Sequence, residues 1–247
     1  MSCTNIMVAG TGNALHPYRS QVGVFIEHGG DMFLVDVGCF VPNILARKGV
    51  EPYEVDHVIV THGHTDHYCG LQQLVFLKTF AQKNPKINLY TVPGAMGLLK
   101  ALVNSVHYSQ ILETTYHEVV PGSRLSIGSM RINVFEAKHS VEAISVSVHA
   151  GDAKIVISGD TAPNEVFREE SKGANLAIHE ASLTSDQEGS REAQWHTTVA
   201  SAIRQVSGSD LGVLYHLSPD SEKEARELQN TQGKIIVPDD GVSFKLC

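Results

Sequence analysis

The sequence predicts an α/β layered domain. Short apolar runs rich in β-branched residues alternate with segments of helical periodicity, and Gly, Pro, Asn or Asp bounds most of the runs. Strands interleaved with helices bury their apolar faces best when helices cover the outside of β-sheets. No repeat, low-complexity tract or linker interrupts the 247 residues, so we expect one domain over residues 1–247.

The predicted strands share β-branched residues and turn-forming neighbours. They are Asn5–Ala9, Gln21–Glu27, Met32–Asp36, His57–Thr61, Ile87–Thr91, Arg131–Ala137, Ile144–His149, Lys154–Ser158, Leu176–Glu180, Gly212–Tyr215, Lys234–Val237 and Val242–Leu246. The predicted helices are Pro42–Lys48, Cys69–Gln82, Ala95–Val106, Pro163–Glu170, Thr197–Ser207 and Ser221–Thr231. Two of these begin with proline, which the first helical turn tolerates.

Composition narrows the partners that the chain can bind. The formal net charge is −8 and the isoelectric point is about 5.9, so we expect no large nucleic-acid partner, which would require clustered Lys and Arg. No apolar run approaches the ~20 residues of a membrane helix, and the first residues do not resemble a signal peptide. Cys3, Cys39, Cys69 and Cys247 form no CxxC pair or disulfide framework, so we expect reduced thiols.

The stretch VTHGHTDHYCGL at residues 60–71 concentrates ionisable side chains directly after a predicted strand. His62 and His64 are two residues apart and can point to one side, while Asp66 and His67 follow on a tightening turn. Burying four such groups is costly without a cation, and the carboxyl end of a strand is where α/β folds bind ligands. The stretch therefore predicts two pairs of ligands for two neighbouring metal ions.

Two pairs of ligands cannot complete two metal sites, so the chain must supply more. His139, Asp160 and His216 each follow a buried-looking strand, although Asp160 alone also suits a turn. The predicted ligands of the first ion are His62, His64 and His139, those of the second are Asp66, His67 and His216, and Asp160 bridges both. Imidazole and carboxylate ligands suit zinc best, and manganese also fits the carboxylate content. Asp36 is expected to support a ligating histidine from behind.

The HGHTDH run, the later His139, the SGDT stretch with Asp160, and His216 together resemble the metallo-β-lactamase superfamily. The resemblance spans nearly the whole chain, from GTG at 10–12 to PDDGV at 238–242. It implies a four-layer αββα sandwich with a dimetal site at one edge. Two divalent ions ~3.5–4 Å apart activate water and stabilise an in-line displacement at phosphorus.

Two further stretches resemble the ribonuclease Z phosphodiesterase group of that superfamily. AIHEAS at 177–182 and WHTTVASAI at 195–203 are similar to its HEA and HST motifs, with Thr197 in place of the serine. The resemblance implies that Glu180 and His196 act as a catalytic pair. A carboxylate raises the basicity of an imidazole, which can then protonate a developing alkoxide. Asp66 would orient the attacking water or take its proton.

The substrate prediction depends on a missing segment. Ribonuclease Z enzymes that mature transfer RNA carry a long Gly/Pro-rich arm, whereas residues 140–159 separate His139 from Asp160 by only two strands and a tight turn. Arm-less chains of this length resemble the anti-Pycsar phosphodiesterases of phages and related bacteria. That resemblance implies a homodimer that hydrolyses small cyclic nucleotides, pyrimidine or purine, in the cytoplasm (of the host cell, if phage-encoded), to counter a nucleotide-signal antiphage defence.

Substrate contacts are expected from two polar segments. The loop at residues 12–21 offers His16, Tyr18 and Arg19 for a base or phosphate, although ordinary loop roles remain open for all three. The segment Thr184–Trp195 precedes His196 and is expected to close over the ligand.

Other functions stay open at this stage. The foremost is a ribonuclease Z-type tRNA 3′ endonuclease, followed by another small-molecule phosphodiesterase such as a carbon–phosphorus-lyase-type cyclic phosphodiesterase. A metal-bearing protein that only sequesters a nucleotide is the non-enzymatic reading. Thioester or lactone hydrolysis and flavo-diiron chemistry also occur in the superfamily, but they give no reason for the HEA and HTT stretches.

Overall fold

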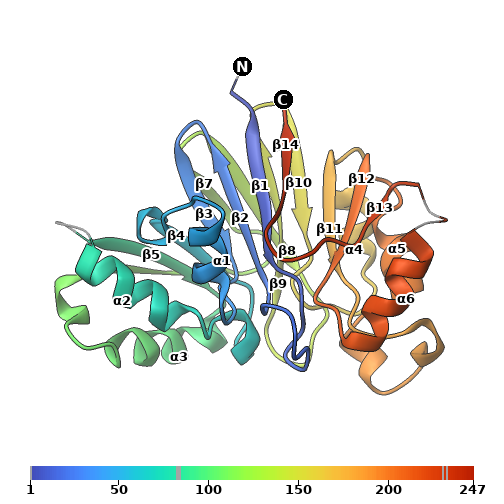
Figure 1. Cartoon of the computed structure of the whole chain (residues 1–247), viewed down its shortest axis with the longest axis horizontal. Coiled ribbons are helices and arrows are strands. Elements are labelled where there is room, and N and C mark those ends of the chain that lie inside the picture. Colours follow the sequence, from blue (N-terminus) through green and yellow to red (C-terminus); the bar gives the residue numbers. More distant parts are fainter. Residues whose placement is uncertain (1, 82–84, 230, 232) are drawn as a thin grey trace.

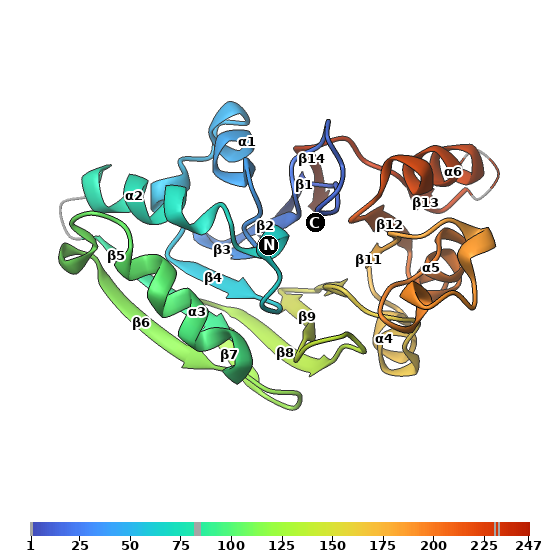
Figure 2. The same ribbon diagram turned by 90° about the horizontal axis from the view of Figure 1, so that it is seen from below.

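The computed structural model describes residues 2–81, 85–229, 231 and 233–247, and within them two seven-stranded β-sheets pack face to face (Figures 1 and 2). The first sheet has the order β14 (Val242–Leu246), β1 (Thr4–Gly10), β2 (Gly23–His28), β3 (Asp31–Val35), β4 (His57–Val60), β5 (Lys86–Thr91), β6 (Glu113–Glu118). The second has the order β13 (Ile235–Ile236), β12 (Leu211–Tyr215), β11 (Leu176–Glu180), β10 (Ala153–Ile157), β9 (Ile144–Ala150), β8 (Met130–Glu136), β7 (Arg124–Ile127).

Helices cover the outer face of each sheet, which gives four layers (Figure 2). Those on the first sheet are α1 (Val41–Arg47), α2 (Leu71–Ala81) and α3 (Pro93–Asn104). Those on the second are α4 (Glu165–Ser171), α5 (Val199–Val206) and α6 (Pro219–Gln229). Short 3-10 turns lie at Pro52–Glu54, Thr65–His67, Ser109–Ile111, Ser185–Gln187 and Glu192–Gln194. No helix in the described ranges is both long and apolar enough to cross a membrane.

The alternation of side chains along the strands divides the core into three clusters. In β1, Ile6 and Val8 pack between the two sheets, whereas Met7 and Ala9 face the helices outside the first sheet. A third cluster, which includes Phe167 and Leu214, lies between the second sheet and its helices. Burial of apolar residues on both faces explains why most strands are continuous apolar runs.

Strand direction brings distant loops to one edge of the sandwich. Strands β3, β4 and β5 are mutually parallel in the first sheet, and β10, β11 and β12 are parallel in the second. Two successive antiparallel pairings, β8 with β9 and β9 with β10, turn β8 in the same direction as β10. The segments that follow these strands therefore emerge together.

The layered α/β prediction is confirmed, and each predicted strand and helix is present with its ends within two residues. Gln82 and Asn230, at the ends of two predicted helices, lie outside the described residues. The sequence analysis missed β6 and β7, each at the edge of a sheet. Strand β6 (ETTYHE) has no fully buried residue and β7 has four residues, so neither carries the apolar run that marks a strand.

The prediction of reduced thiols is wrong, because the structure contains the disulfides Cys3–Cys247 and Cys39–Cys69. Strands β1 and β14 pair antiparallel with Thr4 opposite Leu246, which brings the first and last cysteines together at the top of Figure 1. Their sequence separation is 244 residues, and such a pairing follows from tertiary structure rather than local spacing.

Replacing Cys247 by serine is expected to lower the free energy of unfolding by about 2–4 kcal/mol, because the disulfide restricts the unfolded chain. Urea unfolding without reductant measures this difference. In the presence of dithiothreitol, the wild type and the Cys247→Ser variant should unfold at the same urea concentration. Equal stability without reductant would contradict the bond.

Candidate metal centre and catalytic pocket

Polar side chains from both sheets meet at the shared edge. Each of the seven predicted ligands stands shortly after a strand: His62, His64, Asp66 and His67 after β4, His139 after β8, Asp160 after β10, and His216 after β12. Gly159 permits the approach of Asp160, because its φ of +59° is left-handed and a Cβ there would lie 2.9 Å from the Ile144 carbonyl oxygen.

Asp160 is the centre of the cluster and is almost fully buried. Its Oδ1 lies 3.3 Å from His67 Nε2 and 3.4 Å from His216 Nε2. Its Oδ2 lies 3.7 Å from His62 Nε2 and 4.0 Å from His139 Nε2. One carboxylate thus faces both histidine groups, as the sequence predicts for a bridging ligand.

The ligand atoms form two groups that share this edge. The atoms of each group lie within 4.8 Å of one another; the groups are His62, His64, His139 and Asp160, and Asp66, His67 and His216. A third combination joins Asp160 and His216 with His196. Ligand sets of imidazole and carboxylate in two adjoining groups are typical of a dinuclear metal site.

The rings of His67, His139 and His216 are each held from behind by a hydrogen bond at Nδ1. His67 Nδ1–H donates to Asp36 Oδ2 at 2.8 Å, and His139 Nδ1–H donates to the Trp195 carbonyl at 2.9 Å. Ser182 Oγ donates to the His216 carbonyl, so it accepts from His216 Nδ1–H at 2.6 Å. With Nδ1 engaged in this way, each ring turns its Nε2 toward Asp160, and an unprotonated Nε2 there is the form that a metal requires.

The sequence analysis predicted Asp36 in this supporting role, and its contact with His67 confirms it. It missed Ser182, Thr61 and the Trp195 carbonyl. Thr61 donates to Asp36 and accepts from His62 Nδ1–H at 3.1 Å. Ser182 directly follows the HEA stretch and Thr61 directly precedes His62, but a backbone carbonyl such as that of Trp195 leaves no signal in a sequence.

The electrostatics of the cluster favour a bound cation. Burial lowers the pKa of His62 well below its ordinary value, and the neighbouring His67 lowers it further. Burial also lowers the pKa of His139, so both imidazoles are neutral and able to ligate. His62 Nε2, His67 Nε2 and Asp160 Oδ1 are buried and have no hydrogen-bond partner among the residues that the structure describes. Buried polar atoms are normally paired, so these orphaned donor atoms fit a metal ion.

The second group contains one protonated ring, His67, and one ionised carboxylate, Asp66. Burial opposes protonation of His67, but Asp160 and Asp36 outweigh it and raise its pKa well above its ordinary value. Burial would raise the pKa of Asp66, yet the hydrogen bond from His216 Nε2 lowers it to about 2. A proton on His67 therefore balances the carboxylates here, and a divalent cation would take its place.

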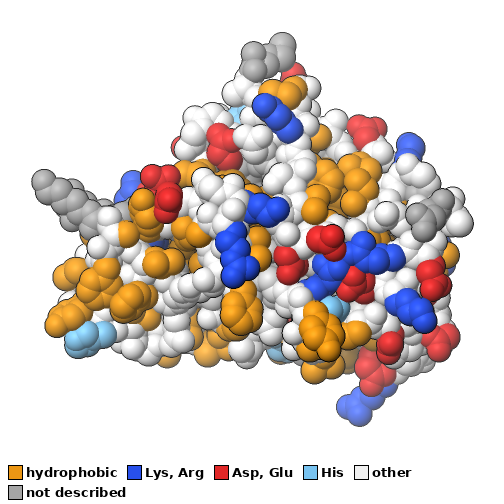
Figure 3. Space-filling model, in the orientation of Figure 1, with side chains coloured by type: hydrophobic (Ala, Val, Ile, Leu, Met, Phe, Trp, Pro, Cys, Tyr) orange, Lys and Arg blue, Asp and Glu red, His pale blue; other side chains and the backbone are white. Residues whose placement is uncertain are grey.

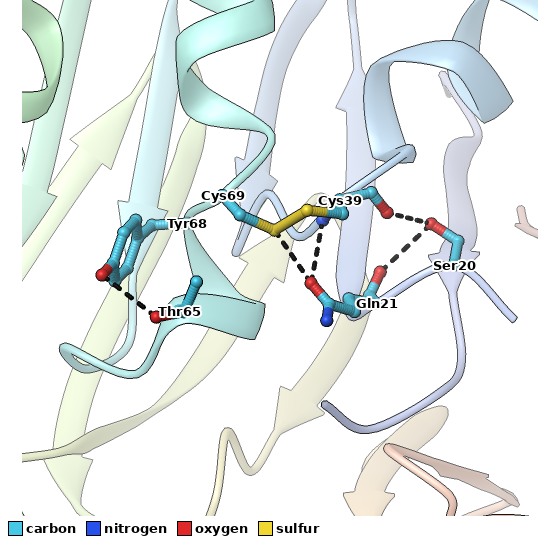
Figure 4. Close-up of a disulfide and its surroundings, with 6 residues drawn as sticks. All are labelled: Ser20, Gln21, Cys39, Thr65, Tyr68 and Cys69. Atoms are coloured by element: carbon cyan, nitrogen blue, oxygen red, sulfur yellow. Dashed lines mark hydrogen bonds between the residues drawn. A yellow bond between two sulfur atoms is a disulfide. The ribbon is translucent and has the colours of Figure 1, made fainter. Parts of the chain in front are cut away.

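A disulfide connects the segment that carries Asp36 to the ligand segment (Figure 4). Cys39 follows the end of β3 and Cys69 follows His67; Val37 N–H also donates to the His67 carbonyl at 2.8 Å. The side-chain oxygen of Gln21 accepts from Cys39 N–H at 3.3 Å, and Ser20 Oγ donates to the Cys39 carbonyl at 2.8 Å. The support of His67 is thereby held against the first sheet.

His196 stands beside the cluster with a buried carboxylate behind it. Its Nδ1–H donates to Glu180 Oε1 at 2.9 Å, and Glu180 also accepts from the backbone N–H groups of Thr161 and Ser182, both at 3.1 Å. Burial alone would lower the pKa of His196, but Glu180 outweighs it and raises the pKa to about 9. The ring is therefore protonated at neutral pH in the metal-free protein, as a proton donor must be.

A pocket of about 630 Å³ opens over His64, Asp66, Asp160, His196 and His216. Its volume lies in the range of small-molecule sites. Residues outside the cluster that form its walls include Asn13, Leu15, Ser182, Leu183, Gln187 and Asp220.

The three predicted substrate contacts do not line this pocket. His16 and Arg19 lie in an ionic network with Glu222, to which His16 Nε2 and Arg19 Nε approach within 2.9 and 2.7 Å. Tyr18 is 90% exposed. The wall that this loop contributes consists of Asn13, Ala14 and Leu15 instead. A role of His16, Tyr18 or Arg19 in substrate binding stays a prediction.

Comparison with known proteins decides the family. The family described as anti-Pycsar protein Apyc1 matches residues 4–232, which is nearly the whole chain. The chain belongs to this family. The match and the metal cluster confirm the predicted resemblance, and the protein is a phosphodiesterase of the metallo-β-lactamase fold.

Relatives of the family share the fold and part of the sequence. Ribonuclease Z of Pyrococcus horikoshii is 26% identical over 263 aligned residues that cover 85% of each chain. The metallo-β-lactamase fold protein YhfI from Bacillus subtilis superposes with a TM-score of 0.83 at 21% identity, covering 98% of this chain and 99% of that one. Human tRNase Z, short form, gives a TM-score of 0.82 at 20% identity over 98% and 99%. The two structural similarities support the fold alone.

The Asp160→Ala variant is expected to lose most of its bound metal, because one carboxylate faces both ligand groups. The matched His196→Ala variant should retain the metal, since His216 and Asp66 hold that side without it. Metal analysis of the purified variants, with circular dichroism to check folding, measures both outcomes. Full metal content in folded Asp160→Ala would refute the bridging assignment.

Proposed function

We propose that this chain, acting as one hydrolase domain, hydrolyses cyclic mononucleotides in order to counter a nucleotide-signal antiphage defence. The observation that carries the proposal is the placement of His196, with Glu180 behind it, beside two groups of potential ligands that Asp160 faces. His196 and members of both groups line a pocket of about 630 Å³. The family match supports the cyclic nucleotide as substrate.

The residues that would hold the metal are the seven ligands of the two groups, and we propose zinc. The orphaned Nε2 atoms and the imidazole-rich ligand set favour zinc over harder cations, with manganese as the alternative. When bound, such an ion pair supplies a nucleophilic water at neutral pH and neutralises phosphate oxygens.

The chain's own residues then divide the remaining work. Asp66, ionised because His216 holds its pKa low, accepts a hydrogen bond or proton from the attacking water. His196 donates from its pocket-facing side to a phosphate oxygen and then to the leaving alkoxide. Glu180 holds the ring of His196 in the donating orientation and stabilises its positive charge.

Transfer RNA 3′ processing is the second candidate, and the printed name of the Pyrococcus horikoshii relative, ribonuclease Z, favours it. Two features speak against it. Strands β9 and β10 and the turn at residues 151–152 fill the space between His139 and Asp160, so no arm extends there. The net charge of −8 also disfavours a long polyanion.

We propose that the enzyme acts in the cytoplasm, of the host cell if it is phage-encoded, because its substrate would be an intracellular signal.

The purified holoenzyme is expected to hydrolyse at least one 3′,5′-cyclic mononucleotide with kcat/KM above 10⁴ M⁻¹ s⁻¹ in order of magnitude. His196→Ala should retain metal but lose about 10²–10³-fold in kcat, the usual cost of a charge-stabilising donor. Chromatography of the nucleotide products measures both. Precursor tRNA is the competing substrate in the same assay, and faster cleavage of it after the discriminator base would replace the proposal with tRNA processing.

We also propose that the protein is a homodimer formed through an apolar patch on α2, α3 and the turn after α3. The patch consists of Phe76, Phe80, Leu98, Tyr108 and Ile111, which are 39–56% exposed. The ring of Phe80 contacts those of Phe76 and Tyr108, with centroids 4.7 and 6.0 Å apart, and hydrophobic side chains gather at this end of the molecule in Figure 3. Contiguous exposed apolar surface is typical of an interface, and a second copy offers an equally apolar face.

Phe80→Glu is expected to convert the protein from a species of twice the 26.8-kDa chain mass to a monomer, because a carboxylate would be buried against apolar side chains. Light scattering after size-exclusion chromatography measures the mass. Val166→Glu on α4 serves as the control, since Val166 is 42% exposed but lies on the other side of the sandwich. A dimeric Phe80→Glu variant, or a monomeric wild type, would refute the proposed interface.

A further inference from the structure

Two side-chain amides line the pocket from different segments of the chain. Asn13 lies in the loop after β1, and its side chain is largely buried. Gln187 ends the 3-10 turn Ser185–Gln187 in the segment that precedes His196. Neither residue belongs to the ligand groups or to the His196–Glu180 pair, so the chemistry described above leaves both unused.

The oxygen of each amide is already engaged. Gln187 Oε1 accepts from the backbone N–H of Thr184 at 3.0 Å, and the Thr184 side chain accepts in turn from the Gln187 backbone N–H, which completes a capping box. Asn13 Oδ1 accepts from Leu15 N–H at 3.0 Å. A backbone N–H can only donate, so these bonds fix which end of each amide is the oxygen. Each side chain therefore presents an –NH₂ group, which no acceptor in the described residues binds.

The other polar side chains that line the pocket outside the proposed catalytic cluster are carboxylates, or hydroxyls already paired within the chain; Thr65 Oγ1, for example, pairs with Tyr68 Oη at 3.3 Å. Asp220 and Glu192 carry carboxylates that, when ionised, only accept hydrogen bonds. Ser182 is engaged with His216, and the Ser218 hydroxyl bonds to Ser221 Oγ at 3.1 Å. Leu15 and Leu183 supply apolar surface of the kind that packs against the faces of a planar ring.

We infer that Asn13 and Gln187 are specificity-determining residues that donate hydrogen bonds to acceptor atoms on the edge of the substrate's nucleobase; this inference rests on the proposed function. The ligand groups hold the phosphate at one end of the pocket. The two –NH₂ groups then meet ring nitrogens or carbonyl oxygens, which every nucleobase carries. Loss of such a donor leaves a base acceptor unpaired and weakens binding of the nucleotide selectively.

Gln187→Glu and Asn13→Asp test this inference. Each variant keeps the oxygen that accepts from Thr184 or Leu15, so the local turns persist, but replaces the –NH₂ donor by an acceptor. With cyclic UMP as substrate, each is expected to lower kcat/KM about tenfold, mainly through KM, while bis-p-nitrophenyl phosphate is hydrolysed within twofold of the wild-type rate. The latter is also a phosphodiester monoanion, but it has neither ribose nor base.

Three controls make the outcome decisive. Gln194→Glu places the same added charge on the same segment but outside this pocket, and should change neither substrate's kinetics by more than twofold. Cyclic dUMP, which lacks the 2′-hydroxyl, should show the same tenfold loss as cyclic UMP. Metal content and thermal melting should match those of the wild type.

The failures of the two proposals are distinguishable. Equal losses with cyclic UMP and bis-p-nitrophenyl phosphate, no loss with either, or a loss that vanishes with cyclic dUMP would overturn the base contact and leave the proposed function intact. A wild-type holoenzyme that cleaves bis-p-nitrophenyl phosphate but no cyclic mononucleotide would overturn the proposed function itself.

Discussion

The functional edge of the fold is built around one buried carboxylate that four imidazole rings surround. Asp160 faces Nε2 atoms of four histidines at 3.3–4.0 Å, and its Oδ1 has no hydrogen-bond partner. Such an arrangement is unfavourable in an apolar interior unless a cation completes it. It also requires strands from two separate sheets to end at the same place. Parallel pairing of β3 to β5 and of β10 to β12 meets that requirement, because it sends successive loops to one edge.

The groups that hydrogen-bond to the predicted ligands from behind connect the metal centre to the rest of the pocket. Asp36 has a left-handed φ of +61° and His216 one of +53°, conformations that cost a non-glycine residue about 1 kcal/mol or more. Both side chains are hydrogen-bonded, which offsets that cost. The ring of His139 is instead hydrogen-bonded to the backbone carbonyl of Trp195, which belongs to the same segment as Gln187. The position of this pocket wall and the orientation of a ligand are therefore coupled through one hydrogen bond.

Motifs of neighbouring residues predict much of this centre. Contacts between residues far apart in the sequence could not be predicted in this way. The HxHxDH spacing, together with polar residues after buried strands, predicts seven side chains that the fold brings together at one edge, and Asp36 behind one of them. The Cys3–Cys247 pair joins opposite ends of the chain, and Glu222, which engages His16 and Arg19, is about 200 residues away in sequence. Nothing near these residues indicates such partners. Strand β6 lies at the edge of its sheet, and its side chains alternate only between exposed and half-buried, so it lacks the apolar pattern that marks an inner strand.

Most of the predicted metal ligands are buried, whereas the predicted proton donor His196 is partly accessible. The predicted ligands His62 and His67 are inaccessible to solvent, whereas the side chain of His196 remains 25% exposed in the pocket. The pKa of His196 is about 9 in the folded metal-free protein and 6.5 when unperturbed. Its protonated form therefore stabilises that protein fully below about pH 6.5, and the contribution is lost as the pH rises through 9. Asp160, 3.9 Å from His196 Nδ1, supplies part of this effect, so a cation bound to Asp160 would weaken it. Glu180 binds no ligand group and retains its charge, so the proton on His196 depends on Glu180 once the metal is present.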